Sequence, residues 1–437
     1  MTSDSAVAAV ENLADAHTRS PVPEADTVSG FQVGMVCVGI AITLPALYTG
    51  GTLARGLGLA DAVSSVLVGA LLLSIMSVPS AIVGVRTRLS SYMVIEHVFG
   101  WGGAKLLNGC FAIVLLGWYA VTAELFGRTL AIAAADFGLV ELPEWLWILV
   151  SSAIVTATTL FGFKALDRLA LLAVPPLTLV LCWMVFEALG ERSFAELLAI
   201  PGEGMPFTEG VSVVIGAMIV NVVLMPDLTR YARTDRDAFV AAFLGNGGGI
   251  VVSTLLAMIP ALAFGVLDPM AQFTLLGIGL LALVVLVFAT WTTNGVNLYS
   301  TGLVAGSALP KAGYVPITLV GGVLGTALAL YGVADRLTDF LVLLGLVVPP
   351  VAGVYLTRFF LLGETDFSEA HFAARPMVDV AALTACLLAG AIGLWAWMQD
   401  LSLTGVAPIE SLLLAGLLYL AAERLQRLRA PAALRQG

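Results

Sequence analysis

The segment ATWTTNGVNLY, residues 289–299, places hydroxyl and amide side chains at the end of a long apolar run. Thr292 and Thr293 bring hydroxyl oxygens beside the backbone carbonyl of Ala289, one helical turn earlier. Neutral oxygens grouped in this way suit a hard monovalent cation, by the same logic that gives calcium and magnesium oxygen ligands. Asn294 carries a donor and an acceptor on one amide, which suits the edge of a planar heterocycle. The segment therefore indicates a cation site next to a small-molecule site.

Helix packing is the other interpretation of this segment. With about 100° between successive residues, its Ser, Thr and Asn side chains share one broad arc of a helix. Such side chains also hold membrane helices together, at about 0.6 kcal/mol per hydrogen bond. We assign Thr290, Asn297 and Thr301 to packing. For the residues at 292–294, periodicity alone leaves both interpretations open.

Three more residues that could do chemistry lie in the apolar segment 105–132. Glu124 is an acid inside a membrane-length run, and such acids are functional candidates. Arg128 follows at i+4, where an ion pair forms readily. Pairing or an extracellular gate is the favoured interpretation, and proton coupling is the alternative. Trp118 lies near the middle of the segment and could stack on a flat ligand, although a membrane-helix Trp otherwise marks the interface.

The composition of the chain requires a lipid environment for these elements. The 437 residues are 59% hydrophobic and 11% charged, against about 25% charged in an ordinary soluble domain. We therefore expect an all-α polytopic membrane protein. The four cysteines lack metal or disulfide spacing, and three histidines argue against a zinc site. The sequence has no G-x-S-x-G motif, metal-binding His pair or basic arm, so we expect neither an enzyme nor a nucleic-acid-binding protein.

Twelve segments reach the length of about 20 apolar residues that crosses a bilayer. They are 31–54, 62–85, 105–132, 144–163, 166–189, 209–226, 238–266, 271–301, 314–334, 336–361, 377–398 and 406–423. With both termini in the cytoplasm, the inner loops and tails hold 16 of the 20 Lys and Arg residues, and the outer loops hold 3, as the positive-inside rule requires. We expect a multi-pass protein of the cytoplasmic (inner) membrane, with a disordered tail at 1–29, one transmembrane domain at 30–425 and a tail at 426–437.

Two segments contain residues that interrupt a helix. The first holds Pro45 and the pair Gly50-Gly51, and the sixth holds Asn221 and Pro226. Proline frees backbone groups, which lipid tolerates only where protein or a water-filled cavity covers them. Interruptions at corresponding positions of two halves point to the substrate site of a transporter. Simple kinks are the alternative.

Four motifs carry a family resemblance: YTGGTLARGLGL, GWYAV, DLTRYART and WTTNGVNLYSTGL. In order and spacing they resemble the nucleobase:cation symporter-1 family, which includes the bacterial cytosine permeases. The resemblance implies a LeuT-like fold with inverted repeats at about 31–190 and 209–361 and two extra helices within 377–423. It also implies transport of nucleobases, hydantoins, allantoin or related heterocycles, coupled to sodium or protons.

The resemblance carries site residues over position by position. The implied sodium ligands are the backbone carbonyls of Gly39, Ile42 and Ala289 and the hydroxyls of Thr292 and Thr293. The implied substrate contacts are Trp118, Ala217, Met218, Asn221 and Asn294. Leu115 replaces a family glutamine, Ala217-Met218 a Ser-Phe pair, Asn221 a small residue and Gly295 an acid. These replacements change the hydrogen-bond pattern of the pocket, which weighs against cytosine and favours another small, neutral, planar heterocycle.

We therefore expect a cation-coupled secondary active symporter that imports a nucleobase or similar heterocycle, with sodium as the favoured ion. The alternative is a proton-coupled importer of a hydantoin, allantoin or hydroxymethylpyrimidine-like compound, and a channel or sensor is more remote. We expect no cofactor beyond the co-transported sodium ion, and no nucleic acid or obligate protein partner. Concentrative uptake would exclude a channel, because a channel cannot accumulate a neutral substrate against its gradient.

Overall fold

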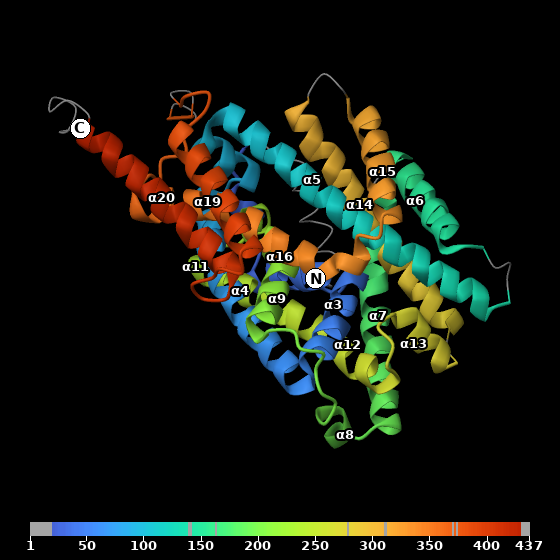
Figure 1. The fold of residues 1–437 in the computed structure, drawn as a ribbon. Coiled ribbons are helices and arrows are strands. Elements are labelled where there is room, and N and C mark those ends of the chain that lie inside the picture. The colour runs from blue at the N-terminus through green and yellow to red at the C-terminus, as the bar shows by residue number, and fades with distance from the viewer. Residues whose placement is uncertain are drawn as a thin grey trace.

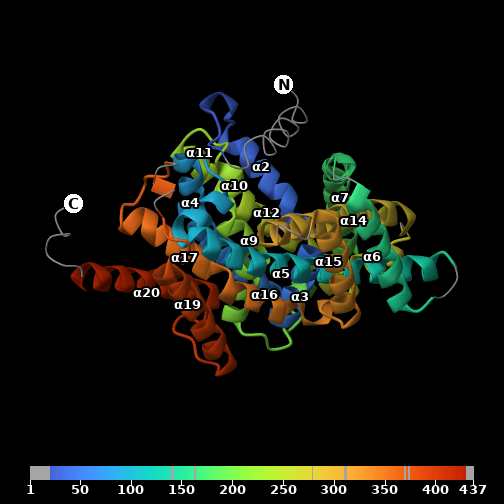
Figure 2. The same cartoon turned by 90° about the horizontal axis from the view of Figure 1, so that it is seen from above.

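The computed structural model describes residues 20–138, 142–161, 164–277, 279–309, 313–368, 371–372 and 375–429. Within these ranges the regular elements are helices, and β-pairing is limited to two isolated bridges. In chain order they are η1 (Glu24–Asp26), α2 (Gly30–Ala41), α3 (Leu44–Leu57), α4 (Leu59–Thr87), α5 (Ser91–Asp136), α6 (Glu144–Phe161), α7 (Lys164–Glu191), α8 (Phe194–Leu198), α9 (Phe207–Val223), α10 (Met225–Thr229), α11 (Asp235–Ala241), η2 (Ala242–Gly248), α12 (Gly249–Phe264), α13 (Pro269–Leu275), α14 (Gly279–Ala308), α15 (Tyr314–Leu330), η3 (Ala334–Arg336), α16 (Leu337–Val347), α17 (Pro349–Leu356), η4 (Thr357–Leu361), α19 (Val380–Met398) and α20 (Ala407–Arg429). In Figures 1 and 2, α19 and α20 lie at one end of the molecule, α6, α14 and α15 at the other, and the long α5 runs between them.

The lengths and hydropathy of these helices fit a multi-pass membrane protein. Five described stretches are long and apolar enough to cross a membrane, and a sixth is added if the bent pair α2–α3 is one span. Each of the twelve expected segments overlaps a helix, including the shorter apolar helices α6, α9 and α15. The count of twelve spans and the inverted repeat stay predictions. Several expected boundaries differ: α5 begins at Ser91 rather than at 105, and the segment 271–301 is divided between α13 and α14.

The first expected span is interrupted, with a bend of 70° between α2 and α3. Ile42 and Thr43 separate the two helices, and Pro45 lies in the first turn of α3, where its missing N–H costs no hydrogen bond. The pair Gly50-Gly51, expected to contribute to the break, lies inside α3 instead. A Cβ at Gly50 would lie 2.4 Å from a backbone oxygen of α12. The glycine therefore permits the close packing of α3 on α12.

The interruption of the sixth expected span lies near its end. Helix α9 continues through Asn221, and Leu224 separates it from α10, which has Pro226 in its first turn. Asn221 therefore belongs to the last turn of α9 and does not interrupt the helix.

The seventh expected span contains a π-helical segment, η2, between α11 and α12. Such segments are rare and frequently occur at functional sites. A Cβ at Gly245 or Gly247 would lie 2.2 Å from side-chain atoms of Cys37 on α2 or Ser74 on α4, respectively. These two glycines allow η2 to pack closely against both helices. Asn246, between them, is fully buried.

Residues 20–29, expected within a disordered tail, are ordered. Val22 is buried and its N–H donates to the carbonyl of Arg88, while the N–H of Val28 donates to the carbonyl of Tyr231. Ser29 then begins α2 with a reciprocal capping box. These contacts fix the segment because they pair its backbone with two distant loops. Residues 426–429, expected in the C-terminal tail at 426–437, belong to α20. The remaining expected tail residues, 1–19 and 430–437, lie outside the described part of the chain.

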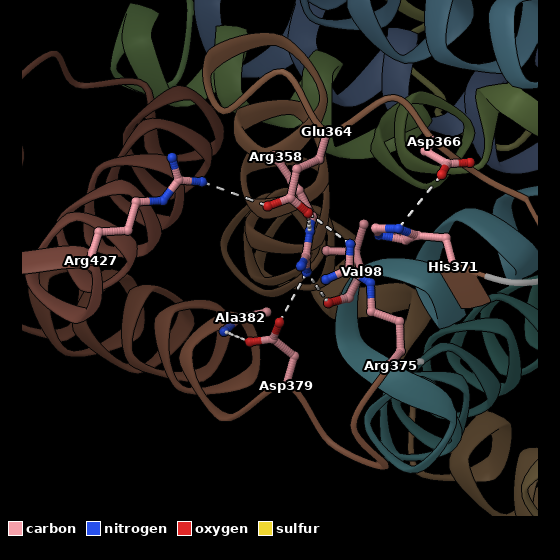
Figure 3. Close-up of polar contacts among 9 residues, drawn as sticks. All are labelled: Val98, Arg358, Glu364, Asp366, His371, Arg375, Asp379, Ala382 and Arg427. Atoms are coloured by element: carbon pink, nitrogen blue, oxygen red, sulfur yellow. Dashed lines mark hydrogen bonds and ion pairs between the residues drawn. The ribbon is translucent and has the colours of Figure 1, made fainter. Parts of the chain in front are cut away.

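A buried arginine holds the loop that follows η4 (Figure 3). The side chain of Arg358 is 4% exposed and donates to Glu364 at 2.7 Å and to Asp379 at 3.0 Å. It also donates to the carbonyl of Val98, near the start of α5, at 2.7 Å. Two further arginines contact Glu364: Arg375 from the same loop and Arg427 from α20. The cluster therefore fastens the loop to α5 and α20.

Candidate functional site

A cavity of about 160 Å³ lies where the α2–α3 break meets α5, α9, α12 and α14. One water molecule needs roughly 10–15 Å³, so the cavity has room for a small organic molecule. Its lining includes Thr43, Thr49, Trp118, Thr122, Asn221, Thr293 and Asn297, and the other described lining residues are apolar. Every described side chain on the wall is uncharged. The cavity therefore suits a neutral ligand, because an ion would be desolvated there without a partner of opposite charge.

Five of the predicted substrate residues line this cavity, namely Leu115 and Trp118 on α5 and Ala217, Met218 and Asn221 on α9. The ring of Trp118 meets Phe340 of α16 nearly at a right angle, at 82°, with centroids 5.3 Å apart. Perpendicular ring pairs are a favourable aromatic geometry. This contact fixes the plane of the indole at the wall of the cavity.

On α14, the cavity is lined by Thr293 and Asn297 rather than by Asn294. These two are one helical turn apart, only about 40° apart around the axis, whereas Asn294 lies about 60° beyond Asn297. Asn297, which we assigned to helix packing, therefore lies on the cavity wall instead. Asn294 is fully buried, and neither its amide oxygen nor its amide nitrogen has a hydrogen-bond partner within the described residues.

Among the five implied sodium ligands, Thr293 lines the cavity and Ile42 lies in the helix break beside it. The backbone of Ile42 is non-helical, with φ −91° and ψ 85°, so its carbonyl leaves the hydrogen-bond ladder of α2. The hydroxyl of Thr293 donates to the carbonyl of Ala289 at 2.8 Å, and that of Thr292 donates to the carbonyl of Phe288 at 2.8 Å, with the carbonyl of Ala289 at 3.0 Å. Both hydroxyl hydrogens are thus directed at the backbone, which leaves oxygen lone pairs for a cation. No atom lies within 4 Å of a Cβ built at Gly39, so the space beside it is open.

The expected ion pair between Glu124 and Arg128 is present, at 2.5 Å, with the Glu124 side chain 1% exposed. Glu124 also accepts from the backbone N–H of Ala334 at 2.7 Å. Arg128 contacts Glu144 and Asp335 at 2.9 and 2.7 Å. The cluster therefore joins α5 to α6 and η3. A role in gating or in proton coupling stays a prediction.

A second polar contact joins α3 to the start of α13. The hydroxyl of Tyr48 donates to the carboxylate of Asp268. The same carboxylate caps α13 by accepting from the N–H groups of Met270 and Ala271. Burial raises the pKa of the Asp268 carboxyl, against the opposing effect of these three hydrogen bonds. Helix α3, the second half of the interrupted first span, is thereby anchored to α13.

Four polar residues on the wall were not singled out as ligand contacts by their sequence pattern: Thr43, Thr49, Thr122 and Asn297. A signal existed for two of them. Thr122 follows Trp118 by four residues, and Asn297 follows Thr293 by four, so each shares a helix face with a predicted site residue. Thr43 and Thr49 reach the wall only because of where the helix breaks.

The fold matches solved membrane transporters. It resembles Mhp1, a nucleobase-cation-symport-1 family transporter solved in a closed conformation with bromovinylhydantoin bound, with a TM-score of 0.77 and 21% identity over 95% of this chain and 96% of that one. The inward-facing conformation of Mhp1 gives a TM-score of 0.82 at 20% identity, over 93% and 92% of the two chains. A Na⁺-coupled sialic acid symporter gives 0.61 at 14% identity, over 98% and 96%. These likenesses show that the chain has the helical membrane-protein fold of these solved structures.

The chain belongs to the family of permeases for cytosine/purines, uracil, thiamine and allantoin, whose model matches residues 21–414. It is 28% identical to the cytosine permease of Escherichia coli (strain K12) over 411 residues, covering 92% of this chain and 93% of that one. It is 23% identical to the hydantoin permease of Microbacterium maritypicum over 368 residues, covering 78% and 75%. The family predicted from the four motifs is confirmed.

Proposed function

We propose that this chain is a sodium-coupled secondary active symporter that imports a small, neutral, planar heterocycle across the cytoplasmic membrane. The observation that carries the proposal is the uncharged cavity at the 70° helix break, with Trp118, Asn221 and Asn297 on its wall. An indole suits the face of a flat ring, and amides suit its polar edges. The substrates named for the relatives, cytosine, hydantoin and, at 27% identity over 232 residues, allantoin, support this class of compound.

Sodium is the coupling ion that the oxygen chemistry favours. The hydroxyls of Thr292 and Thr293 keep lone pairs available, and the carbonyls of Ile42, Gly39 and Ala289 complete an all-oxygen set of the kind that hard cations prefer. The Ala289 carbonyl accepts from the Thr293 hydroxyl at 2.8 Å, and its second lone pair would be available to the ion. Binding would then fix the break between α2 and α3 against α14 and complete the adjacent wall of the substrate cavity.

The proposed topology has twelve spans with both termini in the cytoplasm. The spans are α2–α3, α4, α5, α6, α7, α9–α10, α11–α12, α14, α15, α16–α17, α19 and α20. The first ten form two inverted repeats, and transport proceeds by rocking one group of helices against the other around the central site.

Proton coupling is the alternative, and Glu124 is the observation in its favour. It is an almost fully buried carboxylate within a span, next to a single arginine. The ion pair with Arg128 and the hydrogen bond from the backbone N–H of Ala334, however, tie this carboxylate into a contact between α5 and η3, which gives it a structural role that requires no proton transfer.

The test is uptake into proteoliposomes under imposed gradients. Cytosine, uracil, hydantoin, allantoin and hydroxymethylpyrimidine are offered in turn with an inward sodium gradient or with an inward proton gradient alone. Accumulation above the external concentration that requires the sodium gradient supports the proposal. Accumulation that follows the proton gradient and is lost in Glu124→Gln favours the alternative. Equilibration without accumulation under either gradient contradicts both.

A further inference from the structure

The orientation of the Asn221 amide is set by a chain of hydrogen bonds that begins at Ser77 on α4. The Ser77 hydroxyl donates to the carbonyl of Leu73 at 2.7 Å. A hydroxyl has one hydrogen and two lone pairs, so the Ser77 oxygen can only accept from any further neighbour. That neighbour is the Nδ2 of Asn246, at 2.9 Å.

The Asn246 amide is consequently fixed in one sense. Its Nδ2 faces two acceptors, the Ser77 oxygen and, at 3.7 Å, the sulfur of Met225. The Oδ1 points the other way and accepts from the Nδ2 of Asn221 at 3.5 Å. Asn246 is fully buried in η2, so water cannot substitute for a lost partner and reversing the amide would bring two acceptors together.

Asn221 therefore presents its amide oxygen to the cavity. Its Nδ2 is directed toward Asn246, and Asn221 itself lines the cavity from the last turn of α9. Within the described residues, no hydrogen bond to the Asn221 Oδ1 is present. An amide that could rotate freely would offer its oxygen or its nitrogen on the cavity side equally well, whereas this one holds its oxygen on the side away from Asn246.

We propose that the chain Ser77–Asn246–Asn221 fixes an acceptor in the wall of the cavity and thereby selects heterocycles that carry an N–H or NH₂ donor on the edge facing α9. The inference rests on the proposed function, because it takes the cavity as the substrate site. Asn221 is the specificity-determining contact, and Ser77 and Asn246 are positioning residues.

The consequence for the substrate is directional. A ring N–H opposite the Asn221 oxygen is paired, whereas a ring oxygen at the same place leaves two buried acceptors facing one another. Replacing the N–H by O should weaken binding roughly 10- to 100-fold, because an unpaired buried polar group carries its full desolvation penalty. The exchange barely alters ring size, so the effect is not steric.

The experiment measures dissociation constants on the full-length purified protein in sodium-containing buffer. The probes are two ring pairs, hydantoin with oxazolidine-2,4-dione and uracil with 1,3-oxazine-2,4-dione, in which one ring N–H becomes O. The 3-methyl derivatives of hydantoin and uracil test the other ring N–H. The quantity compared between variants is the ratio of the two constants within a pair, which a general loss of stability does not move.

The variants are Asn221→Ser, Asn246→Leu and Ser77→Ala, with Ser74→Ala as the matched control. Ser74 lies one turn before Ser77 on α4 and its hydroxyl donates to the carbonyl of Ala70 in the same way. In the wild type we expect the dissociation constant of the altered ring to exceed that of its parent by more than about tenfold for at least one N–H. The ratio should fall below about threefold in Asn221→Ser, which removes the acceptor, and in Asn246→Leu, which releases it. The ratio for Ser77→Ala, which removes only the hydroxyl, should fall between these values, and Ser74→Ala should match the wild type.

A wild-type protein that binds these rings with the same ratios as Asn221→Ser and Ser77→Ala overturns the inference and leaves the proposed function standing. A wild type that prefers the ring oxygen over the N–H reverses the polarity and also overturns it. A wild type that binds neither parent ring while it transports another heterocycle overturns it as well, because both parents carry the required donor. Binding and transport of no heterocycle at all contradict the proposed function together with the inference.

Discussion

Replacing Asn294 by leucine should have two opposite effects, on stability and on binding. The Asn294 side chain is 0% exposed, and both of its polar atoms lack a partner within the described residues. Each unpaired buried polar group costs about 1–3 kcal/mol, and leucine has a similar volume without the polar atoms. We therefore expect Asn294→Leu to raise the stability of the ligand-free protein by about 1–3 kcal/mol.

The same substitution should weaken the binding of the transported heterocycle. Asn294 lies between the cavity-lining residues Thr293 and Asn297 along α14, and the family resemblance implies that its amide contacts the substrate. An amide left unpaired until a ligand satisfies it is a functional explanation of a buried unsatisfied group. Loss of one such contact should lower affinity roughly 10- to 100-fold.

Thermal unfolding without ligand and a binding isotherm with the best ligand of the uptake panel measure the two effects. The matched control is Thr290→Val, one turn earlier on α14, where a buried hydroxyl is also unpaired within the described residues. We expect Thr290→Val to raise the melting temperature and to leave affinity unchanged. An Asn294→Leu protein with wild-type affinity would refute the substrate role, and one that melts earlier than wild type would show that the amide has a partner.

Thr293→Val removes a hydroxyl while keeping the shape of the side chain, so sodium should no longer stabilise the protein against heat, and a sodium-dependent shift equal to that of the wild type would count against the site. Arg358→Met removes an arginine whose side chain is only 4% exposed and leaves Asp379 without its arginine, while Glu364 keeps Arg375; the change should cost about 3 kcal/mol of stability. The control is Arg55, which is 57% exposed and pairs with Glu203; Arg55→Met should cost less than about 1 kcal/mol of stability. Equal melting temperatures for the two variants would contradict the structural role of the Arg358 cluster. Gly50→Ala brings a Cβ to 2.4 Å from the α12 backbone and should abolish folding or uptake. The control Gly109→Ala, with no atom within 4 Å of its Cβ, should be tolerated. Normal uptake by Gly50→Ala would show that α3 and α12 are not closely packed in the working protein.

Local sequence determined which segments are helical and where the chain could be interrupted. Apolar runs of membrane length overlap the observed helices throughout, because a backbone in lipid must satisfy its hydrogen bonds within the segment. Pro45 marked the break in the first span near its actual place at Ile42 and Thr43, whereas the pair Gly50-Gly51 lies inside α3. The positions on α5 and α9 taken over from the family, such as Trp118 and Asn221, face the cavity.

Tertiary structure decided which side of each helix faces what. The polar arc of α14 contains several candidates, and its rotation against α5 and the helix break selects Thr293 and Asn297 for the wall and encloses Asn294. Periodicity gives the relative angles of side chains but not the rotation of the whole helix, which depends on packing against neighbours far away in sequence.

For the same reason, the sequence could not predict the close packing at the glycines or the hydrogen bonds that orient the Asn221 amide. Gly50 looks like a helix breaker until the backbone of α12 is seen beside it. In the sequence, Asn246 and Ser77 look like isolated polar residues in apolar spans, 25 and 144 positions from Asn221. In the structure, Asn246 hydrogen-bonds to Asn221, and Ser77 hydrogen-bonds to Asn246. The sequence by itself predicted, through its family motifs, that a small heterocycle is held among these helices. The hydrogen bonds that orient the Asn221 amide arise only from the packing of α4, η2 and α9.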